Sequence, residues 1–434
     1  MNAPRKAAAS TGATTAPRIL PSRTVPPRTP PTRLWAQAGI ALLLLAVLAA
    51  LTSLAALRLR ADLRDLTTTA RTRAAAAYQL HATLADLDAQ HTAGLVPGGG
   101  IGNRQLALTS ARLLRTQAGA LIADLAEDGS AHARVAVLLD VLSRYDATTA
   151  RADDAAGLDH PPGRPPQLAL LHTEQSGDLF DTEALPQADA LARAYTDRAA
   201  DLADRAGTAG TVLGGATAGL GAATVGFLVW WQRDLARRYG RRFSPALLGA
   251  TVLTAAVAVS APLAVLSAAD DTRTAVSGGL RAWQDAAAAR VSAARAASAQ
   301  ASWLVVDPSQ RPALAQQFAA DTRRIATVPD AAVRQRLAVL TADDRRLRAL
   351  GGAADSARAA DLLTGVARRH LAFDVYDVEV HLDARAAARS AAFDAATGAG
   401  RADLAPHPAL PLALLGAAAV GAWLGVRPRL AEYR

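Results

Sequence analysis

The chain has 434 residues, no cysteine and a formal net charge of +9. The lack of cysteine excludes disulfide bonds, thiolate metal sites and a cysteine nucleophile. Arginine supplies nearly all of the positive charge, so the position of the charge along the chain is more informative than its net value.

Four long stretches contain no Asp, Glu, Lys or Arg. At about 1.5 Å of rise per residue, a helix of about 20 residues crosses a hydrocarbon core of about 30 Å. The first stretch is longer than the apolar core of a signal peptide, which has roughly 7–15 residues, so we expect it to be retained as an anchor. The predicted membrane spans are 34–57, 206–231, 246–269 and 406–426.

The charged residues are distributed unevenly between the two sides of these spans. Segments 1–33, 232–245 and 427–434 share one side and contain 14 basic and 2 acidic residues. The long segments 58–205 and 270–405 share the other side and contain 33 basic and 36 acidic residues. Positive residues in short loops favour the cytoplasm. The sequence therefore predicts a multi-pass plasma-membrane protein with both termini inside and both long segments outside.

The first and the middle of the inner segments have distinct compositions. Residues 1–33 are rich in proline and are expected to form a disordered cytoplasmic arm.

The middle segment, 232–245, is too short for a nucleic-acid recognition module, so no nucleic acid is expected as a partner. Its arginines are expected to contact anionic lipid head groups. Arginine mixed with aromatic residues is also typical of protein-binding centres. The candidate contacts for a cytoplasmic partner are Arg237, Arg238, Tyr239, Arg241, Arg242 and Phe243.

Each outer segment has the apolar period and turn spacing of four helices, the arrangement of an up-down bundle. In the second segment, breaks are expected at Asp307-Pro308 and at Gly351-Gly352. The two segments also align weakly after a shift of about 210 residues, which pairs Asp88-Ala89-Gln90 with Ser298-Ala299-Gln300. We therefore expect an all-α protein with four transmembrane helices and two extracytoplasmic four-helix bundles in tandem repeat.

Small residues recur every four positions in the second and fourth spans, a spacing that lets helix backbones approach closely. The residues expected at helix-packing faces are Gly210, Gly214, Ala218, Ala222, Gly226, Gly421 and Gly425. The spans contain no Asp, Glu, Lys or Arg, and ion and proton paths usually need such groups, which counts against a transporter.

The strongest candidate for a metal site is the segment "HLAFDVYDVEVH". On a helix its imidazoles and carboxylates would form one stripe, and these groups suit zinc or another transition metal. A solvated helix face explains the same stripe and is the preferred interpretation, so neither a metal nor another cofactor is expected. The alternative metal ligands are His370, Asp374, Asp377 and His381.

Trp303 precedes the expected break at Asp307-Pro308 and would lie near the tip of the second bundle. A tryptophan there is either part of the core or an exposed anchor for a protein partner. No hydrolase, zinc-protease or kinase signature is present, so we expect no enzyme activity.

The arrangement of a span, a helical bundle and a second span resembles bacterial sensor input domains, although the inner segments are too short for a kinase or HAMP unit. The duplicated, four-span form resembles the actinobacterial GlnX-type signal transducers. The residues that resemble the group's fourth-helix segments are "LLHTEQSGDLFDTEALPQADALARAYTDRA" at 170–199 and "RRHLAFDVYDVEVHLDARAAARSAAFDAA" at 368–396.

This resemblance implies a non-enzymatic transducer that relays a signal from an outer amino-acid-binding lipoprotein to a cytoplasmic Ser/Thr protein kinase. Two other functions are open from the sequence: a transport accessory or channel subunit, and a passive envelope scaffold. The sequence also leaves open whether the chain forms a homo-oligomer.

Overall fold

The computed structural model describes residues 31–98, 101–157, 165–239, 245–352 and 355–431. Helices account for 92% of these residues, which contain no strand. Alanine, leucine and arginine dominate the sequence and are strong helix formers, which agrees with this content. The prediction of an all-α protein is confirmed.

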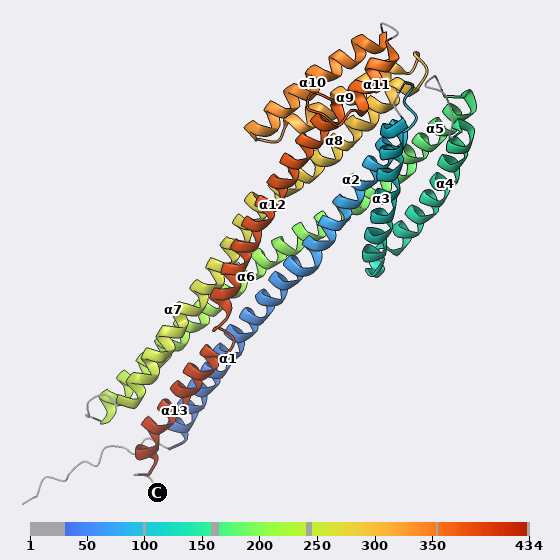
Figure 1. Cartoon of the computed structure of the whole chain (residues 1–434). Coiled ribbons are helices and arrows are strands. Elements are labelled where there is room, and N and C mark those ends of the chain that lie inside the picture. The colour runs from blue at the N-terminus through green and yellow to red at the C-terminus, as the bar shows by residue number, and fades with distance from the viewer. Residues whose placement is uncertain (1–30, 99–100, 158–164, 240–244, 353–354, 432–434) are drawn as a thin grey trace, which may run out of the picture.

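The first half of the chain rises from one end of the molecule, folds back and forth at the far end and returns (Figure 1). Both the rising and the returning helices include a short π-helical turn, in which the backbone hydrogen bonds shift from i→i+4 to i→i+5. The elements are α1 (Pro31–Arg64), η1 (Asp65–Ala70), α2 (Arg71–Ala93), α3 (Ile101–Ala126), η2 (Gly129–Ala131), α4 (His132–Ala156), α5 (Gln167–Leu179), η3 (Phe180–Ala184) and α6 (Leu185–Tyr239).

The second half follows a similar path and ends beside the start of α1 (Figure 1). Its elements are α7 (Pro245–Thr274), η4 (Ala275–Leu280), α8 (Arg281–Val305), α9 (Arg311–Ala326), α10 (Ala331–Gly352), α11 (Ser356–Thr364), α12 (Leu371–Leu404) and α13 (Leu410–Ala431). The ends of α8 at Val305 and α10 at Gly352 confirm the two breaks expected in this half.

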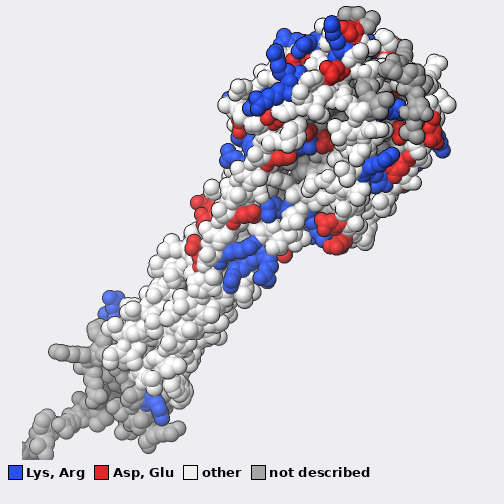
Figure 2. Space-filling model, viewed as in Figure 1, with Lys and Arg blue, Asp and Glu red and all other residues white. Residues whose placement is uncertain are grey.

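Four helical stretches are long and apolar enough to cross a membrane: Arg33–Ala93, Gln167–Arg237, Pro245–Val305 and Leu410–Arg427. Their apolar parts lie together at one end of an elongated molecule, where Figure 2 shows almost no charged side chains. Leu43 and Val212 are each 64% exposed there, and Leu263 is 61% exposed. Such exposure of large apolar side chains on several helices is typical of a surface that faces lipid. The length, hydropathy and exposure of these four helices support the prediction of a membrane protein with four spans.

The helix at the end of the second half is interrupted, unlike its counterpart in the first half. The last helix of the first outer segment continues without a break into α6, as expected. By contrast, α12 ends at Leu404 and α13 begins at Leu410. Pro406 and Pro408 lie between them, and proline cannot donate a backbone hydrogen bond to a helix.

The packing face of α6 differs from the predicted one. Gly210 and Gly214 are buried, but Ala218, Ala222 and Gly226 are exposed. A spacing of four residues advances 400° around a helix, so such a stripe drifts away from a straight partner, whereas alternating steps of three and four residues stay aligned with it. The residues that are buried along α6 follow that alternation: Gly207, Gly210, Gly214, Thr217, Gly221, Thr224, Leu228 and Trp231.

The close approach of α6 is to α7. A Cβ built on Gly210 would lie 2.8 Å from the Cβ of Ala269, and one built on Gly221 would lie 2.6 Å from the Cβ of Ala258. In α13, a Cβ on Gly421 would lie 3.1 Å from the carbonyl oxygen of Ala246, so α13 approaches α7 closely at this position. Gly425 lies partly buried on the same helix.

The two halves meet along α2 and α8, which lie side by side above the apolar end (Figure 1). The π-helical turns η1 and η4, which precede them, each have six residues, and their first residues, Asp65 and Ala275, are 210 positions apart. Ser298 on α8 donates a hydrogen bond of 2.7 Å to Asp88 on α2.

Candidate functional site at the base of the outer helices

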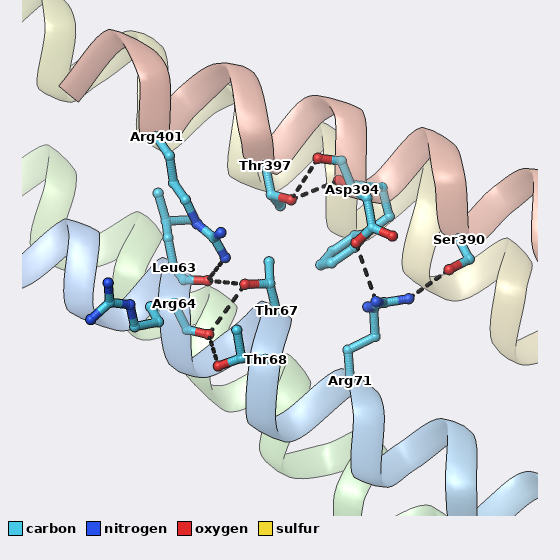
Figure 3. A network of polar contacts seen from close by, with 10 residues as sticks. Leu63, Arg64, Thr67, Thr68, Arg71, Ser390, Asp394, Thr397 and Arg401 are labelled. Carbon is cyan, nitrogen blue, oxygen red and sulfur yellow. Dashed lines mark hydrogen bonds and ion pairs between the residues drawn. The ribbon is translucent and has the colours of Figure 1, made fainter. Parts of the chain in front are cut away.

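The π-helical turn η1 lies where α1 leaves the apolar end of the molecule. Such turns are rare and occur frequently at functional sites. The carbonyl oxygen of Leu63, just before η1, accepts two side-chain hydrogen bonds: one of 2.9 Å from the hydroxyl of Thr67 and one of 3.0 Å from the guanidinium of Arg401 (Figure 3). A charged hydrogen bond therefore joins α12 to the backbone of α1 at this turn.

A second contact joins α12 to α2, about two helical turns further along the chain. The guanidinium of Arg71 donates a hydrogen bond of 2.6 Å to Ser390 and lies 3.4 Å from the carboxylate of Asp394 (Figure 3). Both partners lie on α12. These contacts and the bond from Arg401 fix the rotation of α12 relative to the α1–α2 helix just above the apolar end.

The turn η4 is held from both sides in a similar way. Arg273, just before it, donates a hydrogen bond of 3.2 Å to the carbonyl oxygen of Gly207 on α6. On the other side, a Cβ built on Gly279 would lie 3.0 Å from the Cβ of Phe393 on α12. The backbone and the Cβ of the buried Phe393 therefore occupy the space that a side chain at position 279 would need. The helices α1, α6, α7 and α12 are therefore connected at the level of the two π-helical turns.

Higher up, a partly buried charged cluster connects α2, α8 and α12. The guanidinium of Arg290 lies 2.7 Å from Asp86 and 2.7 Å from Glu379, and 3.7 Å from Asp383. Burial raises the pKa of Asp86, and it raises the pKa of Glu379 well above its usual range. Three carboxyl groups thus share one guanidinium, and the cluster retains protons more strongly than free carboxylates do.

The arginine-rich segment predicted to contact a cytoplasmic partner lies largely outside the described residues. Arg237 is exposed near the end of α6, and the backbone of Arg238 and Tyr239 continues that helix. Arg241, Arg242 and Phe243 lie outside the described residues. The prediction for this segment stays a prediction.

Trp303 is buried, with 7% of its surface exposed, so it does not provide the exposed anchor considered from the sequence. Its ring lies beneath the guanidinium of Arg311, with 4.5 Å between the guanidinium carbon and the ring centroid. A Cβ on Gly351 would lie 2.5 Å from the ring, so the glycine at the end of α10 makes room for it. The tip helices fold over the tryptophan, an effect that a periodicity argument within one helix does not detect.

The stripe considered for a metal is not formed. His370 precedes α12 in an extended conformation and its ring lies 3.5 Å from Asp361, so it is not in helical register with the other three residues. Asp377 pairs with Arg336 at 3.0 Å. Asp374 is buried, and burial together with a hydrogen bond from its protonated carboxyl to Asp343 raises its pKa to about 7. In the described part of the chain, no group of three or more His, Asp or Glu residues could hold a metal ion.

Sequence reasoning missed the residues of both polar sites, including Arg290, Arg401 and Arg71. Each of them contacts a helix that is more than 80 residues away along the chain, so local periodicity contains no signal for these pairs. The only trace in the sequence is the shift of about 210 residues, which also separates η1 from η4.

No protein-family model, curated protein or solved structure matches this chain.

Proposed function

We propose that the chain is a non-enzymatic transmembrane signal transducer of the GlnX type, with both long helical segments outside the cytoplasm. The observation that carries the proposal is the continuity of the helices. Three stretches, Arg33–Ala93, Gln167–Arg237 and Pro245–Val305, combine a candidate span with an outer helix. A displacement of the outer helix is therefore transmitted along a rigid rod to the opposite end of the span.

The distribution of charge supports the orientation. The inner segments carry an excess of 12 positive charges and the outer segments an excess of 3 negative charges. The positive-inside rule then assigns α3, α4, α9, α10 and α11 to the outside.

Three independent features support a tandem repeat of two outer bundles. The halves have the same order of long and short helices, and their π-helical turns begin 210 residues apart. The hydrogen-bonded residues Asp88 and Ser298 are separated by the same number. A duplicated unit whose copies meet around a local two-fold axis brings equivalent positions together in this way.

The contacts at the π-helical turns support a relay rather than a passive scaffold. Arg401 bonds to a backbone oxygen of α1, and Arg273 bonds to one of α6. The bond from Arg401 ties α12 to the helix of the first span, and the bond from Arg273 ties the helices of the second and third spans to each other, both at the level of the π-helical turns. The α2–α8 contact and the spans can therefore move together.

The input and the output are proposed from the resemblance to GlnX-type proteins. They are an extracytoplasmic amino-acid-binding lipoprotein and a cytoplasmic Ser/Thr protein kinase. The exposed Arg237 and the remainder of segment 232–245 are the proposed contact for the kinase, because this segment is the covalent link between spans two and three.

A reversible lock between α2 and α8 tests the proposal. The chain has no cysteine, so D88C/S298C introduces a single thiol pair where the native side chains are 2.7 Å apart. We expect oxidation of this pair to change Ser/Thr phosphorylation of cytoplasmic proteins, and reduction to reverse the change. D88C alone and S298C alone are the matched controls for redox effects. If the locked and released double variants give the same phosphorylation and transcription profiles, the chain is not a transducer.

A further inference from the structure

A pocket of about 480 Å³ lies between α2 and α3 of the first half and α8, α11 and α12 of the second. Cavities of this size are in the range that holds small organic ligands. Its apolar wall comes from Leu106, Leu113, Leu363, Val366, Val375 and Tyr376. Leu113 and Val366 are both 68% exposed, and Tyr376 is 61% exposed, so large apolar surfaces surround the opening.

The polar groups that line the pocket include a buried amide with an unused acceptor. Gln300 is 0% exposed and donates its amide hydrogen to Asp344 over 3.2 Å. Its side-chain oxygen has no hydrogen-bond partner among the described residues. A buried acceptor without a donor costs about 1–3 kcal/mol, so a ligand that supplies a donor to this oxygen is favoured.

The charged groups that line the pocket are all acidic. They are Asp86 and Glu379, and no Arg, Lys or His is found among the lining residues that the structure describes. Arg290 lies behind them and contacts both carboxyl groups, as well as Asp383 on the same side of α12. One guanidinium for three carboxyl groups leaves a deficit of positive charge, and burial raises the pKa of Asp86 and Glu379 accordingly.

We propose that this pocket binds an amphipathic cation, with a primary ammonium group directed at Gln300, Asp86 and Glu379 and an apolar body against α3 and α12. The ammonium group has three donors and no acceptor, which matches a site that offers acceptors. An anion would meet two carboxylates without a basic residue, and a wholly apolar molecule would leave the oxygen of Gln300 unpaired.

The site also joins the two halves of the chain, since α2 and α3 line one side and α8, α11 and α12 the other. A bound cation would therefore strengthen the contact between the halves. This role as the input of the relay rests on the proposed function, whereas the binding itself does not.

Binding is tested on the full chain in nanodiscs by calorimetry with three ligands of matched shape: 4-phenylbutylammonium, 4-phenylbutanol and 4-phenylbutyrate. We expect the ammonium to bind at least about tenfold more tightly than the alcohol, as the loss of a charged hydrogen bond implies, and the carboxylate to bind least. Equal affinity for the ammonium and the alcohol, tighter binding of the carboxylate, or no binding of the ammonium overturns the proposal.

Substitutions inside and outside the pocket test whether the ammonium binds there. Ala372 is an exposed alanine of α12 that lines the pocket, and Ala384 is an exposed alanine of the same helix that does not. We expect A372F to abolish binding of the ammonium and A384F to preserve it. E379Q should lower its affinity about tenfold while leaving the affinity for the alcohol nearly unchanged, whereas Q300L should weaken the binding of both, since each donates to the oxygen of Gln300. If A372F and E379Q, both folded by circular dichroism, bind the ammonium as the native chain does, the ligand lies elsewhere and the proposal is wrong. Because these measurements do not use a cellular response, they can succeed even where the cysteine lock shows no signalling.

Discussion

The hydroxyl of Ser298 on α8 donates a hydrogen bond of 2.7 Å to the carboxylate of Asp88 on α2. Asp88 and Ser298 are also the residues that align when the two halves of the sequence are shifted by 210 positions. A contact between equivalent positions is the property of an isologous interface, in which one patch meets its own copy. The bond between Asp88 and Ser298 is the kind of contact that the proposed duplication predicts for the α2–α8 interface.

The same contact makes the stability of the chain dependent on pH. Burial raises the pKa of Asp88 from its ordinary value of 3.8 to about 6, despite the bond from Ser298. Folding therefore disfavours the ionised form, and the stability associated with Asp88 is highest below pH 4 and is lost as pH rises through 6. The loss is about 3 kcal/mol when complete.

D88N removes this ionisation and keeps an acceptor for Ser298. We expect it to leave the free energy of unfolding nearly unchanged at pH 4 and to raise it by up to about 3 kcal/mol at pH 8. Unfolding curves in detergent at several pH values measure the difference. D140N, at an exposed carboxylate of α4, is the control. If D88N changed the free energy of unfolding equally at every pH, the raised pKa of Asp88 would be contradicted.

The α6–α7 contact can be tested with two glycines that are two positions apart. A Cβ on Gly221 would lie 2.6 Å from the Cβ of Ala258, whereas a Cβ on Gly219 would have no other atom within 4 Å. We expect G221A to destabilise the chain by about 1–3 kcal/mol, because the helices must separate.

G219A is the matched control for the same change of residue type. It should be neutral or stabilise the chain by up to about 1 kcal/mol, since alanine favours helix over glycine. Thermal unfolding in one detergent compares the two. Equal melting temperatures for G221A and G219A would show that α6 and α7 do not approach as closely as described.

The bond from Arg401 to the backbone of α1 is expected to support the base of the outer helices. R401M keeps much of the apolar stem and removes the donor, which should cost about 1–3 kcal/mol. R281M, at an exposed arginine at the start of α8, should have less effect. Hydrogen exchange at η1 gives a second measurement, because the carbonyl oxygen of Leu63 loses one of its two side-chain donors. Unchanged exchange and stability in R401M would exclude this contact as a structural tie.

The orientation follows from the charge distribution and can be checked with reporter fusions. Fusions at residues 20, 238 and 434 should report the cytoplasm, and fusions at 100 and 308 the outside. The fusions control one another, since each reporter must be active at some positions and silent at the others. A cytoplasmic signal at 100 or 308 would reverse the assignment of that outer segment.

The segment between spans two and three is expected to bind the cytoplasmic partner. Replacement of Tyr239 and Phe243 by alanine keeps every charge that directs insertion and removes apolar binding area. We expect Y239A/F243A to insert normally and to lose most of the phosphorylation response to the α2–α8 lock. R237A/R238A lowers the positive charge and keeps both aromatic residues. It therefore distinguishes a loss of lipid contact from a loss of apolar binding area. A full response in the aromatic double variant would reduce the segment to a topology signal.

The amino-acid sequence by itself determined the helical class, the four apolar stretches, the breaks near Asp307-Pro308 and Gly351-Gly352, and the small residues Gly210 and Gly214 at a helix contact. These features depend on hydropathy, turn chemistry and period within about 25 residues, which are local properties. The weak alignment of the two halves at a shift of 210 residues was also visible in the sequence. Only the positions of η1 and η4 in the structure supported it.

Only the tertiary structure decided which face of α6 packs, why Trp303 is buried, and which arginines form the polar sites. The face depends on the small difference between periods of 3.5 and 4 residues, which accumulates along a long helix. The sites depend on pairs such as Arg401 with Leu63, which are 338 positions apart. Chain folding brings such residues together through packing of whole helices, and no pattern within one helix specifies that packing.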